Sequence, residues 1–121
     1  MSKRLLTGAL VVLLSVAGLP AQSHSQLVDV TPRPNQSVAS AKAITLTFNE
    51  ELIDLGGRSN VITVTDSRNR RVSVSATQVA SNTLKATVNQ KLAPGRYTVW
   101  WRAVSADGHP VSGNYRFTVR R

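Results

Sequence analysis

The sequence contains only two histidines, and each stands where it could bind a metal ion. His109 lies in the segment "SADGHPVSG", two residues after Asp107. Gly108 between them permits a positive φ, and Pro110 restricts both its own backbone and that of His109. The segment therefore predicts a stiff turn that presents a carboxylate and an imidazole in few geometries.

The other histidine, His24, follows a candidate export signal. A short basic start precedes the apolar stretch "LLTGALVVLLSVAG" at residues 5–18. A membrane span needs about 20 apolar residues, so this shorter stretch favours a secretory signal peptide over residues 1–23. We expect residues 24–121 to form a single soluble domain that is exported.

The cleavage position decides the chemistry of the new amino end. Small residues at −3 and −1 allow a cut after Ser23, which would leave His24 first, and a competing cut would leave Gln22 first. In the first case the amine and Nδ1 of His24 form a chelate ring, and His109 adds a second imidazole. In the second case the amine, two amides and the His24 imidazole could wrap a Cu(II) ion without His109.

Nitrogen donors with one carboxylate oxygen from Asp107 would form a tetragonal set. Such a set suits Cu(II), whereas Zn(II) prefers a tetrahedron. The chain has no cysteine, and its only methionine is Met1, which leaves with the signal. Because soft sulfur ligands select Cu(I), we expect one Cu(II) ion per chain and no Cu(I) methionine site.

Hydrophobic residues in the rest of the chain alternate with period two, which is typical of strands with one buried face. In "ITLTF", for example, Ile44, Leu46 and Phe48 share one face. Turn residues separate the strands, so the pattern predicts an all-β sandwich or small barrel. Seven strands are expected, at residues 26–30, 43–48, 61–65, 71–76, 83–88, 96–104 and 114–120.

Three stretches of the sequence, "HSQLVDVTPRPNQSV", "ITLTFNEEL" and "GRYTVWWRAVSADGHPVSGNYRFTV", resemble the CopC family of exported copper-binding proteins. The resemblance runs from His24 to the C-terminus. It implies a seven-stranded, immunoglobulin-like Greek-key β-sandwich or barrel. It also implies a Cu(II) site of His24, Asp107 and His109, with Glu50 as a further candidate. Trp101 matches the family's tryptophan, and we expect it to pack in the core.

The chain is basic, with 15 Lys and Arg residues against 6 Asp and Glu residues. The arginines are scattered without the aromatic–basic interleaving of single-strand binders, so we expect no nucleic-acid partner. The positive charge could steer the protein to an anionic membrane surface or an acidic partner. A separate inner-membrane copper transport protein is a candidate partner, and a monomer is expected.

Two rival functions come from other classes. A histidine with a free amine is also a copper site of oxidative polysaccharide-cleaving enzymes, but the sequence shows no row of aromatics for a substrate platform. The other rival is an immunoglobulin-like adhesion module that binds no metal. With no Ser-His-Asp set and no paired carboxylates, we expect a copper-binding protein for sequestration, transfer or resistance rather than an enzyme.

Overall fold

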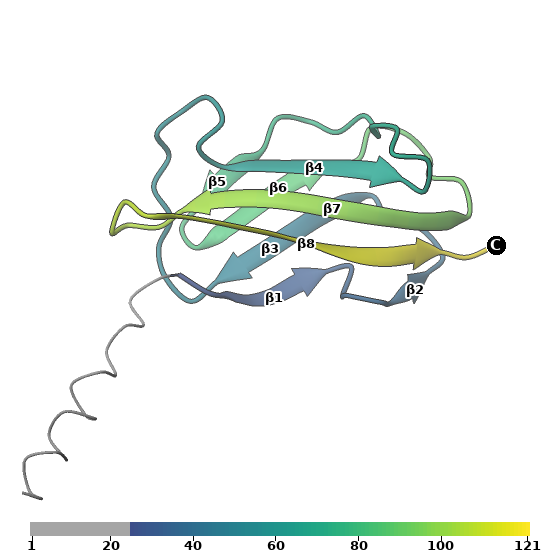
Figure 1. Ribbon diagram of the computed structural model, residues 1–121, viewed down its shortest axis with the longest axis horizontal. Coiled ribbons are helices and arrows are strands. Elements are labelled where there is room, and N and C mark those ends of the chain that lie inside the picture. Colours follow the sequence, from purple (N-terminus) through teal and green to yellow (C-terminus); the bar gives the residue numbers. More distant parts are fainter. Residues whose placement is uncertain (1–24) are drawn as a thin grey trace, which may run out of the picture.

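A computed structural model describes residues 25–121, which form two four-stranded sheets packed face to face (Figure 1). In spatial order, one sheet is β1-β3-β6-β5 and the other is β2-β8-β7-β4. The strands are β1 (Leu27–Thr31), β2 (Ser37–Val38), β3 (Ala43–Phe48), β4 (Val61–Asp66), β5 (Gln78–Ala80), β6 (Thr83–Thr87), β7 (Gly95–Val104) and β8 (Pro110–Val119). Within residues 25–121, no helix is long and apolar enough to cross a membrane.

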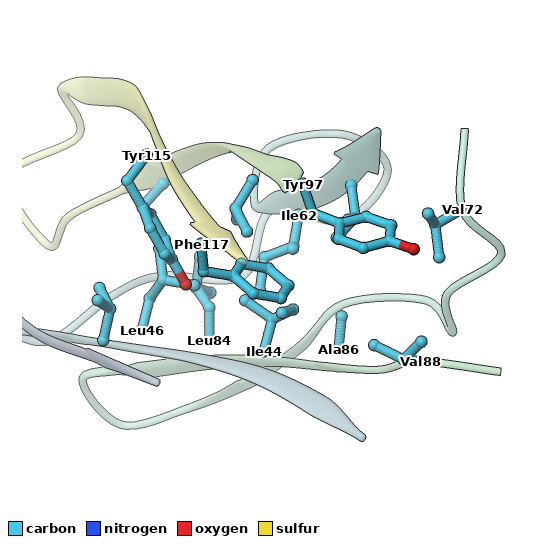
Figure 2. Close-up of a cluster of buried hydrophobic side chains, with 14 of the residues drawn as sticks. Ile44, Leu46, Ile62, Val72, Leu84, Ala86, Val88, Tyr97, Tyr115 and Phe117 are labelled. Carbon is cyan, nitrogen blue, oxygen red and sulfur yellow. The ribbon is translucent and has the colours of Figure 1, made fainter. Parts of the chain in front are cut away.

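The alternating pattern produces the sandwich because strands such as β3, β4 and β6 bury every second side chain. In β3, Ile44, Leu46 and Phe48 are fully buried, while the residues between them are half-buried. Figure 2 shows side chains from both sheets meeting in the core, among them Ile44, Leu46, Leu84, Tyr97 and Phe117. The rings of Tyr97 and Phe117 stack with centroids 5.6 Å apart. The predicted all-β sandwich is confirmed.

Six of the seven expected strands are present, and the expected strand at residues 71–76 is wrong. That segment makes only isolated bridges, Thr65 with Arg71 and Val74 with Val88. The segment changes partner along its length: the Val72 N–H donates to the Val64 carbonyl of β4, whereas the Ser75 N–H donates to the Thr87 carbonyl of β6. A side chain also takes part, because the Thr87 N–H donates to Ser75 Oγ at 2.9 Å. The short strands β2 and β5 were not predicted, so the described residues contain eight strands rather than seven.

The expected packing of Trp101 is confirmed. Its indole is half-buried against the core and meets the ring of Phe48 edge-on, with centroids 5.4 Å apart. Gly113 faces it on the neighbouring strand, and a Cβ atom at that position would lie 2.7 Å from Trp101 Cζ2. The absence of a side chain at residue 113 therefore makes room for the indole.

The long hairpin of β7 and β8 carries the turn singled out in the sequence. The two strands pair without interruption from Gly95 and Val119 to Val104 and Pro110. Residues 105–109 therefore close the hairpin at one end of the sandwich. The described chain begins at that same end (Figure 1).

Candidate metal centre

The turn between β7 and β8 is held by hydrogen bonds around the carboxylate of Asp107. Ser105 is fully buried, and its hydroxyl donates to Asp107 Oδ1 at 2.5 Å. The backbone N–H of His109 donates to the same oxygen at 3.0 Å. Gly108 has a φ of +86°, and its N–H donates to the Ser105 carbonyl at 2.8 Å. The predicted rigidity of this turn thus comes from a buried serine as well as from glycine and proline.

The other carboxylate oxygen faces the imidazole of His109. Oδ2 of Asp107 lies 3.3 Å from Nδ1 of His109, and the two side chains are 30% and 64% exposed, respectively. A carboxylate beside one ring nitrogen favours a proton on that nitrogen and leaves the lone pair on the other. In this arrangement, Nε2 is the nitrogen of His109 that can bind a metal ion.

Asp107 is ionised at neutral pH. The Ser105 hydroxyl lowers the pKa of the Asp107 carboxyl to about 2, with help from the N–H of His109 and against a smaller opposing effect of burial. Both donors stabilise the charged form by hydrogen bonding. The turn therefore offers a negative charge next to an exposed imidazole.

The segment that leaves β3 holds the start of the described chain. The Gln26 N–H donates to Asn49 Oδ1 at 2.8 Å, and the Asn49 N–H donates to the Gln26 carbonyl at 3.0 Å. Ser25, just before this contact, is buried. The chain next to residue 24 is therefore anchored beside residue 49.

The same segment also holds the turn. The Ala106 N–H donates to the Glu51 carbonyl at 3.0 Å, and Leu52 forms an isolated bridge with Ser105. Residues 49–52 thus lie against the start of the described chain at one point and against the turn at the next. Two parts of the chain that are some 80 residues apart in sequence are tied to one short connector.

The structure describes three of the four predicted site residues and brings two of them into contact. Asp107 and His109 lie side by side in the turn. Glu50 is half-buried on the connector, between the residue that contacts Gln26 and the residue that contacts Ala106. His24 lies outside the described residues. Within residues 25–121 there is no group of three or more His, Cys, Asp or Glu side chains that could hold a metal ion.

Two residues that shape the site were missed in the sequence. Ser105 orients Asp107, and Asn49 anchors the start of the described chain. Ser105 was visible as the first residue of the "SADGHPVSG" segment, but its bridge to the distant Leu52 was not. No local pattern marks Asn49, which exchanges hydrogen bonds with a residue 23 positions away.

Comparison with known proteins places the chain in a family. The CopC domain matches residues 27–120, which include the turn and the connector. The chain belongs to the CopC family. The resemblance noted in the sequence is confirmed.

The relatives of this CopC-family chain match it over most of its length. Copper resistance protein C of Escherichia coli is 33% identical over 99% of this chain and 98% of that protein. The crystal structure of CopC from Methylosinus trichosporium OB3b has a TM-score of 0.70 and 32% identity, covering 80% of this chain and 94% of that one. PcoC, described as a methionine-rich copper resistance protein from Escherichia coli, has a TM-score of 0.67 and 29% identity, covering 79% of this chain and 98% of that one.

Proposed function

We propose that this CopC-family chain binds Cu(II) in the periplasm and sequesters the metal or passes it on. Relatives such as copper resistance protein C and PcoC are named for copper resistance rather than for an enzymatic activity. The observation that carries the proposal is the pair formed by Asp107 and His109. The pair is fixed in a turn that shares the 49–52 connector with the start of the described chain.

The proposed ligands come from the two segments that contact that connector and from the connector itself. The amine and the imidazole of His24 supply two nitrogens, and Nε2 of His109 supplies a third. Asp107 contributes an oxygen or, through its contact with Nδ1, orients the His109 ring. Glu50 is a further oxygen donor on the connector itself. Nitrogen and oxygen donors of this kind favour Cu(II) in a tetragonal arrangement.

The proposed oxidation state rests on the lack of sulfur ligands. The chain has no cysteine and a single methionine, Met1, unlike a relative described as methionine-rich. Soft thioether and thiolate donors are what select Cu(I). We therefore expect one Cu(II) ion per chain and no methionine site for Cu(I).

Export would create the amino end that the site requires. The apolar residues 5–18 lie outside the described part of the chain and form the proposed signal. Intact mass of the protein purified after export tests this step. A product that begins at His24 supports the site shared with His109. A product that begins at Gln22 contradicts it and favours a site made by the amino end alone.

Copper binding itself is tested by thermal unfolding of the exported protein. A ligand that binds only the folded state stabilises it by about 2.7 kcal/mol at a hundredfold excess over the Kd. We expect Cu(II) to raise the Tm and Zn(II) to raise it less. A metal-free adhesion module predicts no change in Tm, and a copper oxygenase predicts turnover with dioxygen and a reductant. A monomer and a separate inner-membrane copper transport protein stay predictions.

A further inference from the structure

The outer face of the β2-β8-β7-β4 sheet carries exposed arginines around an exposed tryptophan. Alternation in β7 turns Tyr97 and Val99 into the core and Arg96, Trp100 and Arg102 outward. Arg116 is exposed on the adjacent strand, where it pairs with Thr98 of β7. We call the set of Arg96, Trp100, Arg102 and Arg116 the arginine face.

Trp100 stands near the middle of this face. Its backbone pairs with Asn114 of β8 on one side and with Thr63 of β4 on the other. Its indole Nε1 donates to Thr65 Oγ1 at 3.1 Å, and 46% of the residue is nevertheless exposed. The ring is therefore held against the sheet with a large apolar area in contact with water.

The arginines of this face have no carboxylate partner among the described residues. The ion pairs among residues 25–121 join Asp66 to Arg70 and Asp107 to His109. Neither pair includes a residue of the arginine face. Arg102 reaches only a backbone acceptor, the Arg58 carbonyl, at 3.4 Å. The positive charge of this face is thus uncompensated.

The six acidic residues of the chain all lie elsewhere. Three are in the connection between β3 and β4, at residues 49–60, and Asp107 is in the turn beside that connection. Asp29 is exposed on β1, in the other sheet. Asp66 ends β4, where its Oδ2 lies 3.0 Å from Arg70 Nε. Four of the six acidic residues therefore gather at the end of the molecule that includes the candidate metal centre, whereas Asp66 lines a cleft together with Arg96 of the arginine face.

We propose that the arginine face docks on a bilayer surface rich in anionic phospholipid. Arginines near such a surface are attracted by its negative potential, and tryptophan favours the level of the lipid headgroups. Protein interfaces also use tryptophan and arginine as anchors, but they surround them with other well-packed residues that exclude water. Trp100 is the only large exposed hydrophobic residue on this face, since the others among the described residues, Val28 and Leu55, lie elsewhere.

Docking in this way would leave the candidate metal centre accessible. The arginine face lies along β7 and β8, whereas Asp107 and His109 lie at the tip of that hairpin. The tip would then sit beside the membrane without being covered by it. The inference does not depend on copper binding, so its failure leaves the proposed function intact.

Cosedimentation of the metal-free exported protein with lipid vesicles tests the inference. The vesicles contain equal parts phosphatidylglycerol and phosphatidylcholine, and vesicles of phosphatidylcholine alone are the reference. Intact mass must show that the apolar residues 5–18 are absent, because they would bind lipid themselves. We expect binding to the anionic vesicles alone, and we expect added salt to weaken it because salt screens exposed charges.

Charge variants locate the binding surface. Each arginine near an anionic bilayer contributes about a fivefold gain in binding, so the double variant Arg102→Gln, Arg116→Gln should bind about 25-fold more weakly. Lys85→Gln is the matched control, because Lys85 is exposed on β6 in the other sheet. It should bind within about twofold of the unaltered protein. Unchanged Tm values show that all variants are folded.

Three results would overturn the inference. One is a lack of binding to anionic vesicles, including the case in which the protein binds an acidic polypeptide such as polyglutamate instead. Another is a double variant that binds as well as the unaltered protein. The third is an equal loss in Lys85→Gln, which would show that net charge rather than this face is responsible.

Discussion

In the turn between β7 and β8, Asp107 Oδ2 lies 3.3 Å from Nδ1 of His109, while the other oxygen of Asp107 is hydrogen-bonded to Ser105. A buried hydroxyl thus fixes a carboxylate, and the carboxylate faces an exposed imidazole. We therefore expect substitutions of His109 and of Asp107 to raise the Kd for Cu(II) by different amounts.

Replacing His109 with alanine should remove a metal ligand without disturbing the fold. The side chain is 64% exposed, so the Tm of the metal-free protein should change little. We expect the Kd for Cu(II), measured by competition with a chelator, to rise by about 100-fold or more. Asn114→Ala, at another exposed position of the hairpin, is the control. A Kd within about twofold of the unaltered value would show that His109 is not a ligand.

The change Asp107→Asn should weaken copper binding less. An asparagine keeps an oxygen that can accept from Ser105 and from the His109 N–H, but it loses the charge beside Nδ1. We expect about a 10-fold rise in the Kd for Cu(II). Asp66→Asn is the control, because Asp66 lies at the end of β4 that is far from the turn and pairs with Tyr97 near the start of β7. It should leave the Kd unaltered. If Asp107→Asn costs as much as His109→Ala, Asp107 has a larger role than an orienting or fourth ligand.

Acid should weaken copper binding through nitrogen protonation rather than through Asp107. The Asp107 carboxyl has a pKa of about 2, so it remains ionised throughout the range in which imidazole and amine take up protons. In model peptides, imidazoles and α-amines take up protons near pH 6.5 and about 7.7–8. The Kd for Cu(II) should therefore rise steadily between about pH 8 and pH 5. A Kd that stays constant over this range would contradict nitrogen ligation.

The stability of the metal-free protein should depend on Asp107 in strong acid. Its folded pKa of about 2 lies below the ordinary value of 3.8, so the folded state favours the charged form. This stabilisation is present above the ordinary pKa and is lost as the pH falls through the folded value. The Tm difference between the unaltered protein and Asp107→Asn should shrink as the pH is lowered from about 4 to about 2. A constant difference over that range would argue against the hydrogen bonds to this carboxylate.

Gly113→Ala should destabilise the sandwich. The new methyl group would lie 2.7 Å from Trp101 Cζ2, and the indole cannot move freely because it also contacts Phe48. We expect a loss of about 1–3 kcal/mol in the free energy of unfolding, measured by chemical denaturation. Ser112→Ala, at the exposed neighbouring position, is the control. An unaltered stability for Gly113→Ala would mean that the indole has room to shift.

Most of the fold could be predicted because strand alternation is a local signal. The alternation in and around "ITLTF" predicted β3, and the long alternating runs around Trp101 and Phe117 predicted the two strands of the β7–β8 hairpin. Residues 71–76 alternate as well, yet they form no strand, because their partners include side chains such as Gln90 rather than a continuous neighbouring strand. Pairing partners are a property of the folded chain and cannot be read from period alone.

In the candidate site, too, the local relationships could be predicted and the long-range contacts could not. The adjacency of Asp107 and His109 follows from their spacing in a tight turn, and the contact between them is present. The buried Ser105 and the anchoring Asn49 both depend on contacts between distant segments. Nothing in the local sequence distinguishes them from ordinary polar loop residues.

The most direct test of the central claim is the electron paramagnetic resonance spectrum of the exported protein loaded with one equivalent of Cu(II). We expect nitrogen splitting from the amine and imidazole of His24 and from the imidazole of His109, with the last contribution lost in His109→Ala. A His109→Ala spectrum identical to that of the unaltered protein would contradict a copper ion shared by the amino end and the hairpin turn.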